Sequence, residues 1–285
     1  MFWLDIAKTY DKINSIFRAV FKRNLRGVGY LLRKVKRDHV LMFHGQKMFF
    51  NHKVAGCYVG LINGKYTEIE THLFLKRIIE MIEQKINFID VGANIGEMVL
   101  DLARYEKVKC IYAFEPHPEC AKACKITMIL NGYDNKSKVI QKVLSDNANP
   151  VRFIFNEKSP NASSITFEDV KEGSIVYPST LDNELQNIEE PSILLIDVEG
   201  AEPLVLKGSQ YFIKRTLPLI IFEYNDTSKK YFDLDNIRDI LGNDYNIYRL
   251  RKDAYLDRNY IDTWNCVAIN VNSIFYDLSK TLLKA

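Results

Sequence analysis

The sequence contains 285 residues, of which 47% are hydrophobic and 26% charged, with a formal net charge of +3. This length suits one large domain with additions or two small domains, and the apolar fraction excludes a globally disordered chain. No apolar run approaches the ~20 residues that a membrane-spanning helix requires, and the opening MFWLDIAKTYDKI holds acids and lysines that make a poor secretory signal peptide.

The five cysteines form no CxxC pair and show no zinc-ligand spacing. Their odd number and apolar surroundings are typical of reduced thiols, which indicates a cytoplasmic protein. Cys120 and Cys124 lie one helical turn apart, and we interpret them as small core residues, with metal binding as the alternative.

Positive charge is concentrated in residues 1–37, where ten Lys and Arg stand against Asp5 and Asp11, a net charge of +8. Apolar residues recur there at helical spacing, at Ile13, Ile16, Phe17, Val20 and Phe21. Basic residues share the same helix, at Lys12, Arg18, Lys22, Arg23 and Arg26. One interpretation is peripheral attachment to an anionic membrane face or to a partner. The other, which we favour because amphipathic surface helices are common, is that the apolar stripe packs on the protein itself.

The next segment changes character. Residues 40–68 contain short apolar runs separated by Gly and Asn, which predicts short strands and turns. Residues 67–84 then predict a helix, with Glu68 and Glu70 in the first turn, where the helix dipole favours acids. We therefore expect an extension over residues 1–66, with a basic helix and small β elements, followed by the main domain over residues 67–285.

An alternation of strands and helices begins at residue 86. The expected strands are INFIDV, KCIYAFE, KVIQKVLS, SILLIDV, LPLIIFEY, YNIYRL and WNCVAINV, with VRFIF as a short extra strand. The expected helices cover residues 95–105 and 118–130, a segment beginning at Pro203, and residues 228–241. Nearly continuous apolar strands separated by helices predict a mostly parallel, doubly wound α/β sheet covered on both faces.

Acidic residues follow several of these strands. In open α/β sheets, ligands bind beyond the carboxyl ends of the strands. The residues expected at those ends are Asp90 with Gly92, Asn94 and Gly96; Glu115; Ser145 and Asp146; Asp197 and Glu199; and Glu223. Carboxylates gathered at one edge repel one another, so a ligand carrying hydroxyls and a cation, or a metal ion, would offset that cost.

The first of these ends indicates the kind of ligand. Glu115 follows the glycine loop at nearly the ~20-residue spacing at which an acid binds ribose hydroxyls in dinucleotide folds. The loop reads GANIG, so Asn94 stands where a dinucleotide fold has the glycine that admits a pyrophosphate. A cofactor with ribose and no pyrophosphate fits this pattern, and S-adenosylmethionine is the obvious candidate.

The ordered motifs DVGANIG, AFEP, STLDNEL, LLIDVEGAE and PLIIFE, over roughly residues 66–225, resemble the FkbM-type S-adenosylmethionine-dependent methyltransferases. The resemblance implies the Rossmann-like class I methyltransferase fold, with a seven-stranded sheet whose last strand is antiparallel. It also implies O-methylation of a hydroxyl on a sugar, glycan or related metabolite. Leu195 stands where the family usually has lysine, which argues against a role for lysine there.

The resemblance further implies roles for individual residues. Asp90 would orient the loop or the methionine amino group, and Gly92, Asn94 and Gly96 would let the backbone approach the methionine and ribose. Glu115 would hold the ribose hydroxyls, and Ser145 and Asp146 would lie by the adenine. Asp197 would face the sulfonium. Each acid also has a simpler interpretation as a helix cap or turn residue.

Methyl transfer to a hydroxyl requires alignment of the reactants and removal of a proton. The candidate bases are Asp197, Glu199 and Glu223, with His72 as a further candidate. The same three acids could equally bind sugar hydroxyls. Their oxygens would also suit Mg²⁺ or Ca²⁺, but we predict no metal site.

Other functions stay open at this point. An NAD(P)-dependent oxidoreductase acting on a nucleotide sugar would have G-x-G-x-x-G and a hydride-transfer pair, and neither stands out. A non-catalytic adapter would show decay of the loop glycines or of Glu115, which are present. Nucleic-acid methylation is disfavoured because no aromatic platform for a flipped base follows the fourth strand. The expected partner is therefore a small-molecule or glycan acceptor and no nucleic acid, with the oligomeric state open.

Overall fold

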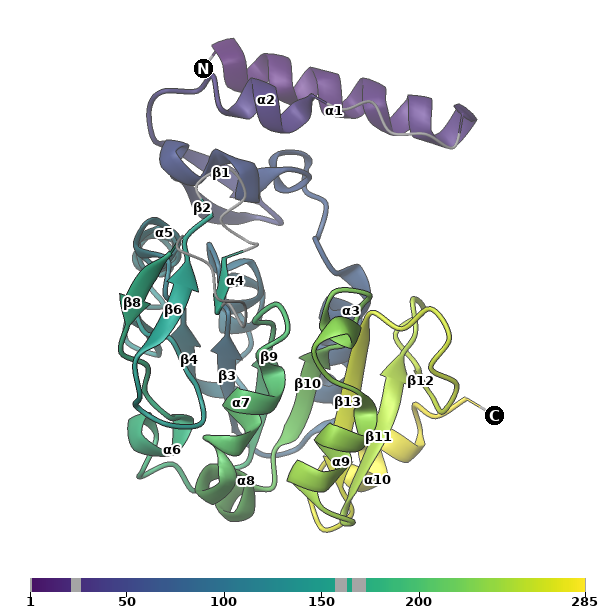
Figure 1. Cartoon of the computed structure of the whole chain (residues 1–285). Helices are drawn as coiled ribbons and strands as arrows, with labels where there is room; N and C mark the ends of the chain where they lie inside the picture. Colours follow the sequence, from purple (N-terminus) through teal and green to yellow (C-terminus); the bar gives the residue numbers. More distant parts are fainter. Residues whose placement is uncertain (1, 22–26, 157–162, 166–172, 285) are drawn as a thin grey trace.

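The computed structural model describes residues 2–21, 27–156, 163–165 and 173–284 (Figure 1). An eight-stranded sheet at its centre has the strand order β12-β11-β13-β10-β9-β3-β4-β5. In chain order these strands are β3 (Ile86–Val91), β4 (Val108–Phe114), β5 (Ser137–Ile140), β9 (Ser192–Ile196), β10 (Leu219–Glu223), β11 (Tyr245–Leu250), β12 (Leu256–Asp257) and β13 (Asn265–Asn270). The neighbouring strands β10, β9, β3, β4 and β5 are parallel to one another. Strand β13 runs antiparallel to β10 and β11.

This topology confirms the predicted α/β fold. The seven expected strands are present with the last one, β13, antiparallel, and the two-residue β12 adds an eighth at the edge. Neighbouring side chains on a strand point to opposite faces, so Phe88 enters one apolar core and Ile89 the other. Helices cover both faces, as a doubly wound sheet requires.

The helices divide between these two cores. One face is covered by α3 (Ile69–Met81), α4 (Glu97–Ala103), α5 (Pro118–Leu130) and α10 (Tyr276–Lys280). The other is covered by α6 (Leu181–Glu184), α7 (Glu202–Lys207), α8 (Gln210–Thr216) and α9 (Leu234–Leu241), with the 3-10 turn η4 (Ser228–Lys230) before α9. The helix predicted from Pro203 is thus two helices, separated at Gly208, where a Cβ would come within 2.0 Å of the carbonyl oxygen of Ser145.

The third strand is shorter than predicted. It ends at Ile140, and the following residues instead pair with a distant segment, because Ser179 accepts from Ser145 N at 2.9 Å and donates to Val143 O at 3.0 Å. The predicted extra strand VRFIF exists as β6 (Val151–Ile154). It belongs to a separate antiparallel sheet with β7 (Ser164–Ile165) and β8 (Ser174–Val176).

The N-terminal extension packs against the main domain through a shared core. It comprises α1 (Phe2–Phe21), α2 (Val28–Leu32), the hairpin of β1 (His39–Phe43) and β2 (Gln46–Phe50), and the 3-10 helices η1 (His52–Tyr58) and η2 (Leu61–Asn63). Phe49 N donates to Thr127 Oγ1 on α5 at 3.0 Å, which fixes the hairpin on that helix. Figure 1 shows the extension beyond the carboxyl ends of β3 and β4.

The orientation of α1 differs from the favoured prediction. Its buried side carries Leu4, Ala7 and Asp11, whereas Ile13 and Ile16 are exposed to solvent. The expectation that the apolar stripe packs on the protein is therefore wrong for these two residues. The remaining predicted residues of this segment lie outside the part whose side chains the structure describes. They are the apolar residues Val20 and Phe21 and the basic residues Arg18, Lys22, Arg23 and Arg26. No described helix is both long and apolar enough to cross a bilayer.

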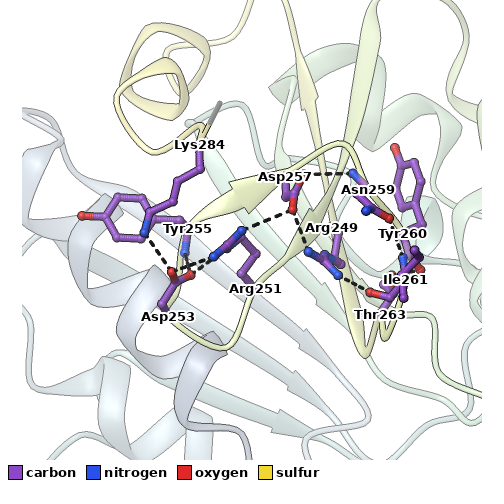
Figure 2. A network of polar contacts seen from close by, with 10 residues as sticks. All are labelled: Arg249, Arg251, Asp253, Tyr255, Asp257, Asn259, Tyr260, Ile261, Thr263 and Lys284. Carbon is purple, nitrogen blue, oxygen red and sulfur yellow. Dashed lines mark hydrogen bonds and ion pairs between the residues drawn. The ribbon is translucent and has the colours of Figure 1, made fainter.

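A polar network closes the far edge of the sheet (Figure 2). Arg249 Nη2 lies 2.6 Å from Asp257 Oδ2 across the β11–β12 pair, and Arg251 extends the network to Asp253. Lys284 adds a further ion pair to Asp253 at 3.0 Å. Charged side chains of this kind protect an edge strand from pairing with another chain. The network also holds the loop that leads to Trp264, a residue of the cavity described below.

Candidate active site

A cavity with an empty volume of about 960 Å³, open solvent included, lies at the carboxyl ends of the parallel strands. Its wall includes Glu115 after β4, Asp197 and Glu199 after β9, and Glu223 at the end of β10. A second hollow beneath η1 shares Gly92, Asn94 and Asp197 with it, so the two spaces are neighbours. The predicted location of the site at this sheet edge agrees with the rule for open α/β sheets.

The glycines of the first loop allow close packing inside the protein. A Cβ on Gly92, at φ 98°, would lie 1.8 Å from the carbonyl oxygen of Asp197. A Cβ on Gly96, at φ 85°, would lie 2.5 Å from Cys124 Sγ on α5. Glycine is required at both positions because a side chain would separate β3 from β9, or α4 from α5. From the sequence we predicted that these glycines let a cofactor approach the backbone, and the sequence did not reveal their role in packing.

Glu115 is held in one orientation by the backbone. Its Oε2 accepts a hydrogen bond from Asn94 N at 2.7 Å, and its Oε1 accepts one from His117 N at 2.7 Å. Burial raises the pKa of Glu115 to about 7, although these two hydrogen bonds act in the opposite direction. Each oxygen of the Glu115 carboxylate can accept one further hydrogen bond, so the two oxygens can still accept hydrogen bonds from two vicinal hydroxyls.

Two further acceptors face the second hollow. Asp90 is buried at the end of β3, and its burial, together with the charges of Glu115 and Glu68, raises its pKa to about 8. Asn94 has the left-handed φ of 48°, and its buried Oδ1 has no hydrogen-bond partner among the described residues. A buried acceptor without a partner costs free energy unless a ligand supplies the donor. This hollow is therefore suited to a cationic or hydrogen-donating group.

Part of the cavity wall is apolar. It is formed by Val143, Leu144, Phe153 and Ile165, which we call the apolar slot, and it suits a flat ring. Ser145 and Asp146, which we predicted beside an adenine, are not among the cavity-lining residues. Ser145 is buried and donates to Asp146 Oδ1 at 3.2 Å. Their place on the wall is taken by residues 142–144, because the strand predicted to continue to Ser145 ends earlier.

The predicted acidic residues do come together at the ends of β9 and β10. Asp197, Glu199 and Glu223 line one wall, and Glu202 lies buried behind them. Oxygens of Asp197, Glu202 and Glu223 lie within 4.8 Å of one another. None of the described ion pairs supplies this wall with a Lys or Arg. The three oxygens could accept hydroxyl protons or hold a hard divalent cation.

Hydrogen bonds fix two members of this cluster. Asn225 Nδ2 donates to Glu223 Oε1, and Ser228 Oγ donates to Glu223 Oε2 at 3.3 Å. Glu202 Oε1 accepts from Val198 N at 3.1 Å and from Gly200 N at 3.3 Å, which closes the loop after β9. By contrast, none of the described side-chain hydrogen bonds holds Asp197.

Burial and mutual repulsion keep the cluster protonated to unusually high pH. Burial is the main cause, followed by the neighbouring carboxylates, and together they raise the pKa of Glu223 to about 8. The same causes raise the pKa of Asp197 well above its ordinary value. Glu202 has its pKa raised to about 7, chiefly by burial.

Two site residues were missed by the sequence reading. Glu68, interpreted only as a helix-dipole acid, lines both hollows and accepts from Asn265 Nδ2 at 2.7 Å. Glu202, the first residue of α7, is also part of the carboxylate cluster. Both stand within three residues of a predicted site motif or helix start, but their proximity to Glu223 depends on tertiary packing.

His72 is not positioned as a base for the acceptor. Its Nδ1 lies 2.7 Å from Asp101 Oδ2 and its Nε2 lies 3.3 Å from Glu97 Oε1, with both carboxylates on α4. These two partners raise the pKa of the ring against the effect of burial. A protonated ring that donates through both nitrogens has no lone pair left to accept a proton. The geometry thus speaks against the predicted catalytic role and supports a role in packing α3 on α4.

The raised pKa of Glu223 predicts a pH-dependent stability. The native state holds this proton up to about pH 8, whereas the unfolded state releases it near the ordinary value of 4.5. Wild-type stability should therefore fall as pH rises between these values. We expect E223Q to stabilise the cofactor-free protein on the order of 2 kcal/mol at pH 8 and much less at pH 5, measured by urea unfolding.

The exposed acid Glu189 provides the matched control, and E189Q should follow the wild-type pH dependence. An E223Q stabilisation of equal size at both pH values would contradict the assignment of a retained proton to Glu223.

The strand order, with its antiparallel β13, and the position of the site are those of the class I methyltransferase fold that the motifs predicted. The family model described as "Methyltransferase FkbM domain" matches residues 90–252. The chain therefore belongs to the FkbM methyltransferase family, as the motifs predicted. Comparison with curated proteins finds no match.

Several solved structures are similar to this chain. A methyltransferase FkbM from Methylobacillus flagellatus KT is 17% identical, with a TM-score of 0.47, and the match covers 67% of this chain and 45% of that one. The chain thus covers less than half of that protein's length. M. jannaschii TYW2, solved in complex with AdoMet, is 14% identical with a TM-score of 0.41, covering 87% and 88%. An rRNA methylase from Streptococcus thermophilus is 14% identical with a TM-score of 0.40, covering 72% and 97%.

Proposed function

We propose that this protein is an S-adenosylmethionine-dependent O-methyltransferase that acts on a hydroxyl of a sugar, glycan or related metabolite. The observation that carries the proposal is one cavity bounded by the backbone-oriented carboxylate of Glu115 and by the carboxylates of Asp197 and Glu223. The first suits a ribose, and the other two suit the hydroxyls of an acceptor.

The residues present fit the proposed cofactor. Glu115 would accept the ribose hydroxyls, and the apolar slot at Leu144 and Phe153 would take the adenine. Asp90 and Asn94 Oδ1, which has no partner among the described residues, would accept hydrogen bonds from the amino group of the methionine portion. When bound, S-adenosylmethionine supplies an electrophilic methyl group on a cationic sulfur.

Among the acids, we assign Asp197 as the general base that removes the proton of the acceptor hydroxyl. Of the three candidate acids Asp197, Glu199 and Glu223, it is the one that lines both hollows, so it stands where the cofactor half and the acceptor half of the site meet. Burial and the neighbouring carboxylates raise the pKa of Asp197, which makes its ionised form a stronger base than an ordinary carboxylate. Glu223, fixed by Asn225 and Ser228, would orient the acceptor through its other hydroxyls. Trp264 on the same wall would pack against the apolar face of a sugar ring.

Calorimetric titration of the purified protein with S-adenosylmethionine tests the first half of the proposal. Binding with micromolar affinity is the expected result, while NAD and NADP should give no heat. Release of S-adenosylhomocysteine in the presence of a panel of nucleotide sugars and polysaccharide fragments tests the second half. A folded protein that binds NAD and not S-adenosylmethionine would replace the proposal with the oxidoreductase alternative.

A further inference from the structure

Helix α1 carries apolar side chains on the side that faces solvent. Phe2, Ile6, Thr9, Ile13 and Ile16 recur every three or four residues and so share one side of the helix. Phe2 is 70% exposed, Ile13 is 52% exposed and Ile16 is 68% exposed. We refer to Phe2, Ile6, Ile13 and Ile16 as the outer stripe.

The opposite side of α1 is held by polar contacts as well as apolar ones. Asp11 is buried there, and its Oδ2 lies 2.9 Å from Lys65 Nζ and 2.9 Å from Asn63 Nδ2. Leu4 and Ala7 are buried on the same side. These contacts fix the rotation of the helix about its axis, because turning the outer stripe inward would break the ion pair between buried Asp11 and partly exposed Lys65. A surface helix normally has the reverse arrangement, with its apolar side on the core.

Aromatic and basic side chains adjoin the same region. Trp3 is 40% exposed beside Phe2, with their rings 5.4 Å apart in an edge-to-face contact. A surface hollow at this point is lined by Phe2 and Trp3 together with Lys34, Lys36 and Arg37. Tryptophan and lysine or arginine at the border of an apolar helix face are typical of segments that lie in a membrane interface.

Charge decides which partner fits this surface. Residues 1–37 carry a net charge of +8, against +3 for the whole chain. A second copy of the chain would bring another +8 against the first, so self-association through the outer stripe is electrostatically opposed. An anionic lipid surface instead attracts the lysines and arginines, and the apolar side chains can insert among its acyl chains.

From this arrangement we infer that α1 docks the protein on an anionic membrane surface, with the outer stripe buried among the acyl chains and Trp3 at the headgroup level. Figure 1 shows α1 at one extremity of the molecule, where a flat surface can approach it. The inference does not depend on the substrate of the methyltransferase domain.

Sedimentation of the full chain with lipid vesicles tests the inference. The protein should bind vesicles of phosphatidylcholine mixed with phosphatidylglycerol and bind pure phosphatidylcholine far more weakly. Raising the salt to about 0.5 M should weaken the binding, because it screens the charge. I13S/I16S should lower the affinity about tenfold or more, since both side chains would lose their burial in lipid. Trp3 should shift its fluorescence to shorter wavelength with the anionic vesicles, and W3F should lose that shift.

A matched control is available on other surfaces of the protein. Ile129 is 53% exposed and Ile261 is 67% exposed, which closely reproduces the exposure of Ile13 and Ile16. I129S/I261S should bind vesicles like the wild type. Equal vesicle binding by I13S/I16S and the wild type would overturn the inference, as would equal affinity for neutral and anionic vesicles. A wild-type dimer that I13S/I16S converts to a monomer, with no vesicle binding by either, would identify a second copy as the occupant and also overturn it.

Discussion

Replacing Glu115 with alanine is expected to weaken the binding of S-adenosylmethionine about a hundredfold. In the variant, the ribose hydroxyls of the cofactor would lose two hydrogen bonds to the carboxylate, each worth about 1.5–3 kcal/mol for a charged acceptor. A loss of 3 kcal/mol corresponds to roughly a hundredfold change in the dissociation constant. Calorimetry measures this directly, and E115Q should be intermediate because its amide keeps only one acceptor oxygen.

The ribose assignment can be separated from a general loss of structure. Glu119 lies four residues later on α5, where it pairs with Lys53 outside the cavity, so E119A should retain the wild-type affinity. A cofactor analogue lacking the ribose 2′-hydroxyl should bind the wild type more weakly than the normal cofactor and bind E115A equally well. Binding of S-adenosylmethionine to E115A within twofold of the wild type would remove Glu115 from the cofactor site.

The features of the site that were predictable are those set by local sequence. Strand β3, the glycine loop and Glu115 belong to one βαβ unit, since Glu115 directly follows β4, and the backbone N–H of Asn94 donates to Glu115 within that unit. Asp197 and Glu223 also end apolar strands, and parallel strands bring their carboxyl ends to one edge. Position at a strand end therefore sufficed to bring these side chains into one cavity.

The features that escaped prediction depend on contacts between distant segments. The strand after β4 stops early because Val143 and Ser145 bond to Ser179, and no local pattern announces that partner. The orientation of α1 has a similar cause. Its apolar periodicity favoured burial of the face with Ile13 and Ile16, but the buried face is the one with Asp11, which pairs with the distant residue Lys65. Periodicity alone reports that a helix has two sides and does not report which one is packed.

The second large effect concerns Asp197. We expect D197N to lower the rate of methyl transfer by about 10²–10⁴-fold, the range that a positioned general base contributes. The substitution keeps the size of the side chain and removes its ability to take the acceptor proton. Single-turnover measurements should place the loss in the transfer step, because the affinity for S-adenosylmethionine depends mainly on Glu115.

The neighbouring carboxylate provides the matched test of this assignment. Glu223 loses its proton at about pH 8, and its negative charge then helps to raise the pKa of Asp197. Because glutamine never acquires that charge, E223Q should lower the pKa of Asp197. Since a base acts only when deprotonated, the rising limb of the pH–rate profile should shift to lower pH in E223Q. An unchanged limb, or a D197N rate within tenfold of the wild type, would transfer the role of base away from Asp197. The pH profile thus separates a base from a residue that only orients the acceptor, because an orienting residue would change the maximal rate and leave the limb in place.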